Sequence, residues 1–225
     1  MLPSTLITAS YQRRGQGDSQ SDIAYRTLKK KIVTLALPPA SLLNESALIE
    51  ELELGRTPIR EALQRLALEN LVVILPRRGT IVADLNMSDL QKVFELRLEL
   101  EAWAASLAAE RVTPEQLVEM KALFSQADKI IQEGDHHQLI DLDMQSHRQL
   151  VQAAHNEFLE GTLERLYTHV LRLWYVSLHK ISRLSTSIEE HREIIVAVEA
   201  GEGKKAAEIM RAHIMGFQDE FLGVL

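Results

Sequence analysis

The sequence predicts a mainly α-helical protein of two parts, in which three helices and a β-hairpin precede an all-α bundle of about six helices. Hydrophobic residues recur at helical spacing through most of the 225-residue chain, and strand-like segments occur only around residues 72–83. Charge changes sign near the same position, because residues 1–83 carry a net charge of +3 and residues 84–225 carry −10. All eight histidines also lie after residue 83. We therefore expect a basic binding module followed by an acidic domain with different chemistry.

The composition excludes several classes of protein. The chain has no cysteine, so disulfides, cysteine zinc sites and thiol catalysis are excluded, and the expected compartment is the cytoplasm. No apolar run approaches the roughly 18 residues that span a bilayer, so no membrane partner is expected. Residues 1–20 lack an apolar segment after basic residues, which argues against a secretory signal and predicts a disordered tail.

Caps and breaks predict the first two helices. One helix begins at Ser21 or Asp22 and ends before the prolines at positions 38 and 39, because proline interrupts helical hydrogen bonding. Asn44 is a good N-cap for a second, short helix. Residues 54–55, Leu-Gly, then supply a tight break before the third helix.

The stretch GRTPIREALQRL, residues 55–66, predicts the third helix. Thr57 can cap it, and Pro58 suits the first helical position because its missing N–H needs no partner there. Arg60 and Gln64 then face outward. A left-handed Asn70 closes the helix, after which VVIL and TIVA flank PRRG as a two-stranded hairpin. The inward stripe of the helix consists of Ile59, Leu63 and Leu66.

Three helices followed by a hairpin with arginines at its tip describe a winged helix-turn-helix. Arg60 and Gln64 lie one turn apart on a helix that fits a DNA major groove, where side chains reach base edges. Arg56, together with Arg77 or Arg78, would contact the DNA backbone or a minor groove. A solvated helical face beside a basic loop is the alternative interpretation of the same residues.

The segment ALIEELELGRTPIREALQRLALENLVVILPRRGTIV resembles the DNA-binding module of the GntR family of bacterial regulators, whose pattern runs through S-R-T-P-V-R-E-A-L to a Gly-containing wing. The likeness covers roughly residues 22–83. We expect a DNA-binding domain over residues 21–83 and a linker at 84–87. Two departures are Gly55, which replaces a serine and removes a phosphate-contacting hydroxyl, and Ala40-Ser41, which replaces Pro-Gly. Operator contacts are implied at four matching positions, Arg56, Thr57, Arg60 and Gly79. The full expected DNA-contacting set is Arg56, Thr57, Pro58, Arg60, Gln64, Arg77, Arg78 and Gly79.

From Ser88 onward only helical periodicity is found, and it predicts an all-helical domain over residues 88–225. Three polar tetrapeptides, at 113–116, 135–138 and 187–190, resemble capping boxes that open helices. The expected helices span residues 88–111, 114–132, 136–154, 157–181, 188–200 and 203–222.

Few ionisable residues fall inside the apolar stripes of these helices, and burying one is costly unless it is paired or bound to a metal. Asp143 and His147 lie four residues apart and point the same way. His191 and His213 lie in the stripes of the last two helices. One carboxylate and three imidazoles suit zinc or nickel, with manganese or iron as further options, and leave coordination positions open. The alternative is that each histidine is separately hydrogen-bonded in the core.

Arg97 and Glu101 lie in the middle of the apolar stripe of the first bundle helix. A buried arginine needs an acceptor, and Glu101, one turn away, provides one in the structural interpretation. In the functional interpretation, Arg97 binds the carboxylate of a small organic acid whose oxygens also complete the shell of the metal.

The patterns D-x-x-x-H, E-H-R-E-I-I-x-A-V and A-x-x-x-M-R-x-H-I resemble the ligand-binding FCD domain of the FadR-type GntR subfamily, over about residues 88–222. In metal-binding members of that domain the matching positions are the ligands, which implies a metal site of Asp143, His147, His191 and His213. An arginine in the first helix of that domain often binds the effector, which implies an effector site at Arg97 and Glu101.

These resemblances imply a regulator rather than an enzyme. It would bind a two-fold symmetric DNA operator as a homodimer, and a small carboxylic acid in its helical domain would change its affinity for DNA. A metal-dependent hydrolase is the alternative from another class, although no H-E-x-x-H arrangement supplies a general base. A second alternative keeps the DNA-binding role and makes the metal itself the signal.

Overall fold

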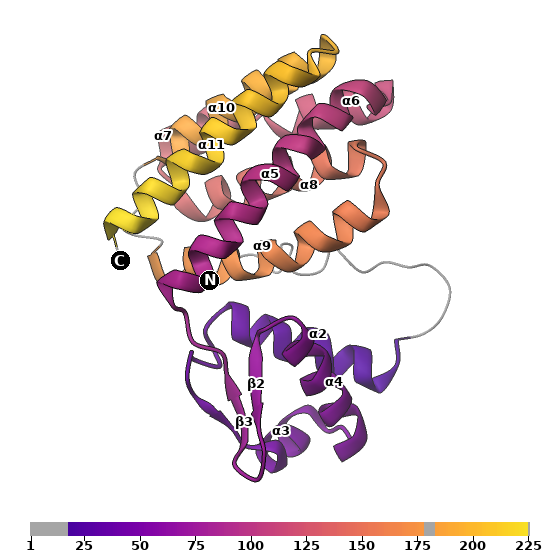
Figure 1. The fold of residues 1–225 in the computed structure, drawn as a ribbon, viewed down its shortest axis with the longest axis vertical. Helices are drawn as coiled ribbons and strands as arrows, with labels where there is room; N and C mark the ends of the chain where they lie inside the picture. The colour runs from indigo at the N-terminus through magenta and orange to yellow at the C-terminus, as the bar shows by residue number, and fades with distance from the viewer. Residues whose placement is uncertain (1–17, 178–182, 225) are drawn as a thin grey trace. The chain divides into compact units, whose positions relative to one another are not determined.

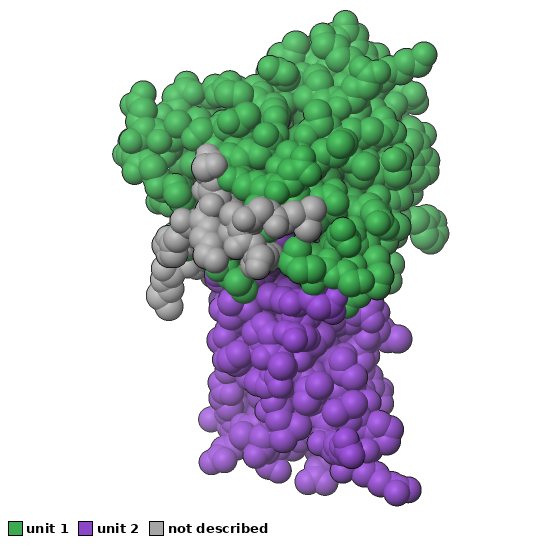
Figure 2. Space-filling model, turned by 60° about the vertical axis from the view of Figure 1, so that its left-hand side comes forward, with its two compact units in different colours: residues 1–8, 87–167, 176–225 green, residues 9–86, 168–175 purple. Residues whose placement is uncertain are grey.

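The computed structural model describes residues 18–177 and 183–224, and the chain divides into two compact units (Figures 1 and 2). One unit, called here the winged-helix unit, holds the described residues up to Asn86 together with Thr168–Tyr175. The other, the helical unit, holds Met87–Tyr167 and the described residues from Val176 onward. The predicted mainly α-helical fold is confirmed. Residues 1–17, most of the predicted tail, lie outside the described residues.

Three helices and a small sheet form the winged-helix unit (Figure 1). Its buried side chains come from every one of these elements and form one core, because each helix turns an apolar stripe inward. The β-hairpin was predicted, but the third strand was not. A two-residue strand is too short to leave a periodic signal, and it adds to the edge of β3 so that the sheet order is β1-β3-β2. The elements are α2 (Gln20–Val33), β1 (Leu42–Leu43), α3 (Glu45–Leu52), α4 (Arg56–Leu68), β2 (Val72–Leu75) and β3 (Gly79–Val82).

Helix ends in this unit follow the predicted chemistry at two positions and differ at others. Asn44 caps α3 through its side chain, and Asn70 has the predicted left-handed backbone, with φ 57°. Helix α4 begins at Arg56, so the expected cap at Thr57 is wrong, and Gly55 occupies the N-cap without a side-chain hydrogen bond. Ser19 caps α2, two residues before the first predicted start.

The described part of the helical unit is built from seven helices, of which α9 also contributes residues 168–175 to the winged-helix unit (Figure 1). Helices α5 and α11 pack side by side, and α10 packs against both α8 and α11. The ligand candidates on α8 and on α11 therefore both lie on helices that contact α10. The seven are α5 (Met87–Arg111), α6 (Pro114–Leu123), α7 (Ala127–Glu133), α8 (His136–Ala153), α9 (Glu157–Ser177), α10 (Leu184–Glu199) and α11 (Gly203–Val224).

The single helix expected over 114–132 is wrong, because the chain forms α6 and α7 with a turn between them. Backbone hydrogen bonds in the turn join residues three apart, including Phe124 N–H to Lys121 O and Ala127 N–H to Phe124 O. The turn leaves the buried ring of Phe124 beside the imidazole of His191, at 6.4 Å between ring centroids. The predicted caps at Thr113 and Asp135 are confirmed.

Helix α10 begins at Leu184, so the capping box expected at Ser187 is wrong. Ser187 is completely buried inside the helix, and its hydroxyl donates a hydrogen bond to Oδ1 of Asp143. Ser187, the first residue of the tetrapeptide at 187–190, therefore forms a hydrogen bond inside the bundle and does not cap a helix. The last predicted residues of the helix over 157–181 lie partly outside the described residues.

Candidate metal centre and nucleic-acid interface

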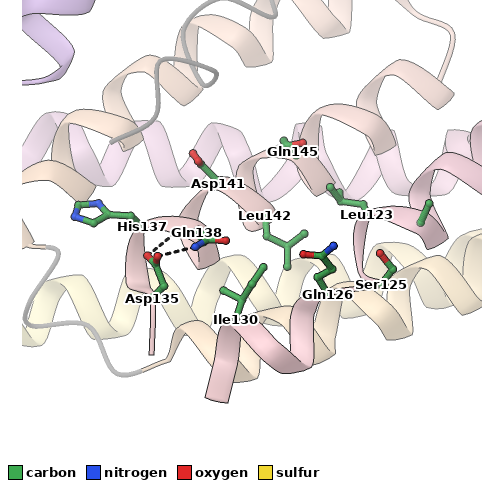
Figure 3. A pocket seen from close by; sticks show the side chains of 11 residues that line it. Leu123, Ser125, Gln126, Ile130, Asp135, His137, Gln138, Asp141, Leu142 and Gln145 are labelled. Carbon is green, nitrogen blue, oxygen red and sulfur yellow. Dashed lines mark hydrogen bonds between the residues drawn. The ribbon is translucent and has the colours of Figure 1, made fainter. Parts of the chain in front are cut away.

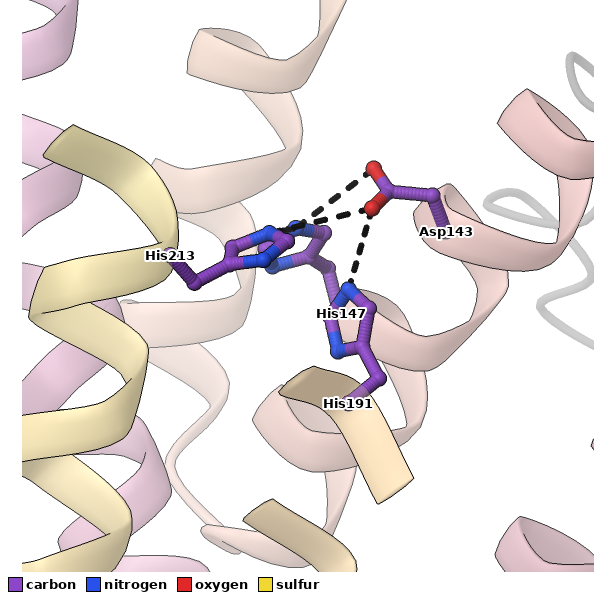
Figure 4. A group of neighbouring side chains, drawn as sticks. All are labelled: Asp143, His147, His191 and His213. Atoms are coloured by element: carbon purple, nitrogen blue, oxygen red, sulfur yellow. Dashed lines mark hydrogen bonds and ion pairs between the residues drawn. The ribbon is translucent and has the colours of Figure 1, made fainter. Parts of the chain in front are cut away.

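Asp143, His147, His191 and His213 converge in the interior of the helical unit (Figure 4). Asp143 and His147 project from one face of α8 because four residues make about one helical turn. His191 comes from α10 and His213 from α11. One ligand atom from each residue lies within 4.8 Å of all the others, and all four side chains are buried. The structure therefore brings together the whole set that the sequence suggested.

Each histidine turns its Nε2 atom toward the centre of this group. The Nε2 atoms of His147 and His213 are 3.1 Å apart, and Nε2 of His191 is 3.1 Å from Oδ1 of Asp143. Nε2 of His147 is 3.7 Å from Oδ2 of Asp143, and Nε2 of His213 is 3.7 Å from Oδ1. Three imidazole nitrogens and a carboxylate thus face one common point.

Two carboxylates outside the group contact the opposite ring nitrogens. Nδ1 of His147 pairs with Oε2 of Glu101, and Nδ1 of His213 lies 2.9 Å from Oε2 of Glu190. The ion-pair contact of His147 with Glu101 and the hydrogen-bond contact of His213 with Glu190 both favour a proton on Nδ1 and a lone pair on Nε2. Two lone pairs that face one another at 3.1 Å repel unless a cation, a proton or a metal ion, lies between them. This arrangement fits a divalent metal ion.

Charge in the group also suits a metal. Burial alone would raise the pKa of Asp143, but the hydrogen bond from His191 and the neighbouring imidazoles hold that pKa well below its ordinary value. Burial lowers the pKa of His191, and burial also lowers the pKa of His213 well below its ordinary value. Asp143 is therefore ionised and these two imidazoles are neutral near pH 7, which are the forms that bind metals.

Arg97 and Glu101 are both buried on α5, where Nε of Arg97 lies 2.5 Å from Oε1 of Glu101. The other oxygen of Glu101 accepts from the Tyr167 hydroxyl at 3.0 Å and contacts His147. Burial opposes ionisation of Glu101, but Arg97 and His147 outweigh it and lower its pKa to about 2. Within the described residues, the terminal Nη1 and Nη2 groups of Arg97 have no hydrogen-bond acceptor.

Four residues around the ligands were not predicted from the sequence to belong to the metal site. Tyr167 lies on α9, Ser187 and Glu190 lie on α10, and Glu101 was assigned only to Arg97 and the effector. A Glu that directly precedes a ligand histidine was a usable signal for Glu190. No sequence signal joins Glu101 to His147, because which helix faces meet depends on tertiary packing.

A pocket of about 630 Å³ lies elsewhere on the helical unit, between α8 and the segment that joins α6 to α7 (Figure 3). Asp141 and Gln145 of α8 contribute to it, and helical spacing directs them away from the face that carries Asp143. Its lining contains the carboxylates of Asp135 and Asp141 but no lysine or arginine. An anionic ligand is therefore not suited to this pocket.

Asp141 is 8% exposed, and burial raises its pKa to about 6. Because the folded pKa exceeds the ordinary value, this group destabilises the fold as pH rises from about 4 to 6, and the full penalty is present above that range. We expect Asp141→Asn to raise the free energy of unfolding at pH 8 by about 1–3 kcal/mol, with the difference vanishing toward pH 4. Urea unfolding at both pH values measures this.

Asp135→Asn is the control for that experiment, because a hydrogen bond from the Gln138 backbone lowers the pKa of Asp135. It should not stabilise the fold at pH 8. A lower stability of Asp141→Asn than of the wild type at pH 8 would contradict the assignment.

The predicted DNA-contacting residues of α4 lie on its solvent face. Arg56, Thr57, Arg60 and Gln64 are exposed, and Pro58 is half-buried in the first turn. The guanidinium of Arg60 donates from Nε to Glu45 of α3 at 2.9 Å and stays 58% exposed. Arg56, Arg60 and Gln64, which lie one turn apart, thus form an open strip along the helix together with Thr57.

Arg65 differs from these residues, although it belongs to the same helix. Its guanidinium donates to Asp22 of α2 at 2.8 Å and lies over the ring of Tyr25, 4.0 Å from the ring centroid. This arginine joins α4 to α2, and it was not placed in the DNA-contacting set.

The turn between β2 and β3 carries the other predicted contacts. Leu75 pairs with Gly79, so Pro76, Arg77 and Arg78 project as the tip of the wing. Arg77 and Gly79 both have left-handed backbones, with φ 61° and 99°, and glycine tolerates the second value without strain. Arg77, Arg78 and Gly79 are exposed.

No helix within the described residues is long and apolar enough to cross a membrane.

Family models match both parts of the chain. Residues 20–82 match the model described as bacterial regulatory proteins, gntR family, and residues 92–216 match the FCD domain. The FCD match alone spans more than half of the chain.

Similar proteins are described as transcription regulators, not as enzymes. The uncharacterized HTH-type regulator YdhC of Bacillus subtilis is 29% identical over 85% of this chain and 84% of its own length. The Escherichia coli repressor GlaR is 29% identical over 85% of this chain and 90% of its own. A solved structure of Escherichia coli McbR/YncC shares the fold with a TM-score of 0.78, at 23% identity over 92% of this chain and 99% of that one.

Proposed function

Because this chain belongs to the GntR family of bacterial regulatory proteins and carries an FCD domain, we propose that its helical unit holds a divalent metal ion, binds a small carboxylic acid beside it and thereby changes the affinity of the winged-helix unit for operator DNA. Regulation of transcription through DNA binding is common to the family and to the similar proteins named above. The metal, the acid and the direction of control are the proposed parts.

The observation that carries the metal proposal is the meeting of three Nε2 atoms and one carboxylate in a buried space. Two of those nitrogens face each other at 3.1 Å, and a carboxylate contacts the opposite ring nitrogen of each. Such a donor set suits zinc or nickel, while manganese and iron remain options. Asp143, His147, His191 and His213 would be the ligands, and the metal would supply a Lewis-acidic point for an oxygen ligand.

The charge balance around the site favours an anionic effector. Arg97 offsets Glu101, and Arg183, which is paired with Glu190, offsets that carboxylate. Asp143 then leaves one negative charge, so a divalent ion makes the centre positive by about one unit. A single carboxylate restores neutrality in the buried interior. A carboxylic acid therefore suits the site better than an amine.

Arg97 is the proposed second partner of that acid. Nε of Arg97 donates to Glu101, and the two Nη groups of Arg97 have no acceptor among the described residues. These two groups therefore form a fork that can bind a carboxylate. Glu101 belongs to the effector site through its hold on Arg97. A purely structural Arg97–Glu101 pair remains the alternative, and it predicts that Arg97→Lys binds the acid as well as the wild type does.

The exposed strip on α4 and the tip of the wing are the proposed contacts with DNA. Arg60 and Gln64 would read base edges in the major groove, and Arg56, Thr57 and Pro58 would lie near phosphates at the start of α4. Arg77, Arg78 and Gly79 of the wing would contact the backbone or a minor groove.

We propose that two chains form a homodimer on a two-fold symmetric operator. Leu96 and Trp103 lie two turns apart on one face of α5, and they are 52% and 50% exposed. Large apolar side chains in such positions often mark an interface between subunits. Trp103→Glu is expected to shift the protein from dimer to monomer in light scattering, whereas Val118→Glu on α6, which is 67% exposed, should leave the dimer intact.

Operator titration of three preparations tests the proposed function. Metal-free protein, zinc-loaded protein and zinc-loaded protein with a panel of small carboxylic acids are compared on the same duplex. We expect the affinity to change by about 5–150-fold when both zinc and an acid are present. The full change with zinc alone would instead make the metal the signal.

A further inference from the structure

We propose that Glu101 and Glu190 are positioning residues of the metal centre, each of which holds the Nδ1 proton of one ligand histidine so that its Nε2 faces the ion. This inference rests on the proposed metal site and deepens it. The two carboxylates come from different helices, α5 and α10, and serve different ligands, His147 and His213.

Glu101 is fixed before it reaches His147. Its side chain is 1% exposed, and its two oxygens are engaged by Arg97 on one side and by the Tyr167 hydroxyl, at 3.0 Å, on the other. The oxygen that Tyr167 contacts is also the one that pairs with Nδ1 of His147. The ring of His147 is therefore oriented by a carboxylate that cannot rotate without losing two other bonds.

Glu190, like Glu101, is fixed by contacts at both of its carboxylate oxygens. Its Oε1 pairs with the guanidinium of Arg183, and its Oε2 lies 2.9 Å from Nδ1 of His213. The guanidinium of Arg183 occupies space beside Gly216 of α11, where a Cβ atom would overlap it. The absence of a side chain at position 216 thus gives Arg183 its place next to Glu190.

The third histidine provides an internal contrast. Nδ1 of His191 is buried, and among the described residues no ion pair joins it to a carboxylate. Its orientation is set from the other side, by the contact of its Nε2 with Asp143 at 3.1 Å. Carboxylates at Nδ1 are thus a feature of two ligands and not of every buried histidine in this bundle.

A carboxylate at Nδ1 fixes the tautomer and the angle of the ring, and it makes Nε2 a stronger donor to the metal. Loss of such partners typically weakens metal binding by about 10–100-fold. The same carboxylates keep two Nε2 lone pairs pointed at one another, which is unfavourable without a cation. They therefore favour the metal-bound state over the empty one.

Glu190→Gln and Glu190→Ala test this inference, with Glu164→Gln as the matched control. Glu164 is also ion-paired to an arginine, Arg148 at 2.7 Å, and its side chain is 24% exposed against 21% for Glu190. The carboxylates that contact Nδ1 of His147 and Nδ1 of His213 are those of Glu101 and Glu190. Zinc affinity is measured by competition with a chromophoric chelator, and the His213 tautomer by long-range ¹H–¹⁵N NMR of the zinc-loaded protein.

We expect the Glu190 variants to bind one zinc per chain about 10–100-fold more weakly than the wild type, with the hydrogen-bonded Nδ1 proton signal of His213 lost or shifted. Glu164→Gln should stay within about two-fold of the wild type. Wild-type zinc affinity in both Glu190 variants would overturn the inference while leaving the metal site intact. A wild-type protein that binds no zinc would instead overturn the proposed function itself.

Glu101 needs a different variant, because its removal leaves the buried Arg97 without a counter-ion. The double variant Arg97→Gln, Glu101→Gln keeps the pair neutral, and Tyr167→Phe removes one hydrogen bond while retaining the carboxylate. We expect the double variant to lose zinc affinity as the Glu190 variants do, and Tyr167→Phe to lose much less. Wild-type affinity in a folded double variant would contradict the role of Glu101, and if that variant does not fold, Glu190 alone decides the inference.

Discussion

His147→Ala is expected to release the metal from the helical unit. His147 is completely buried and lies at the centre of the group, with its Nε2 facing both His213 and Asp143 and its Nδ1 held by Glu101. Loss of a ligand removes a direct bond to the ion. Loss of a carboxylate that only orients a ligand weakens metal binding by up to about 100-fold, so loss of the ligand itself should weaken it by more. His213→Ala should have the same effect, because its Nε2 supplies the facing donor.

Elemental analysis of the purified variants measures this directly, and thermal unfolding gives a second readout. A ligand that binds only the folded state stabilises it by about 4 kcal/mol at a concentration about 1,000 times Kd. Addition of a chelator should therefore lower the unfolding temperature of the wild type and leave that of His147→Ala unchanged.

His155→Ala is the matched control for the histidine variants. His155 follows the end of α8, where its exposed side chain contacts Gln116 at 3.2 Å. It should retain one metal per chain. Full retention by His147→Ala would show that the converging group is not the site that holds the ion.

Arg60→Ala is expected to reduce the preference for the cognate operator, whereas Arg77→Ala reduces affinity for all duplexes. Arg60 lies on the exposed strip of α4, and loss of a bidentate contact with a base costs about 1–3 kcal/mol of discrimination. Arg77 lies at the tip of the wing, and loss of one phosphate contact lowers the slope of log K against log salt by about 0.9.

Fluorescence anisotropy on an operator obtained by selection from random duplexes, and on a scrambled duplex, measures both effects at several salt concentrations. Glu45→Gln controls for the ion pair that Arg60 makes in the free protein, at 2.9 Å. That variant frees Arg60 without removing it, so specificity should persist. Equal losses on cognate and scrambled DNA for Arg60→Ala would assign it to the backbone.

Local signals in the sequence predicted much of the fold because they act over a few residues. Thr113 and Asp135 cap helices as expected, and Asn70 takes the left-handed conformation that its short polar side chain tolerates. Ser187 has the same kind of signal, but its hydroxyl bonds to Asp143 instead of a helix end. Tertiary contacts can thus redirect a residue that looks like a cap.

The candidate site was predictable to the extent that it rests on helical spacing. A shared face for Asp143 and His147 follows from their separation of four residues, and the stripes around His191 and His213 indicated burial. The partners Glu101 and Glu190 depend on which faces of α5, α10 and α11 meet, and one sequence contains no measure of that. The break between α6 and α7 was not predicted, because no glycine or proline marks it in the sequence.

Native mass spectrometry of the protein as isolated tests the central claim most directly. We expect a dimer that carries one divalent metal ion per chain and releases a small carboxylic acid on denaturation. A metal-free protein that takes up neither zinc nor nickel when they are supplied would contradict the account.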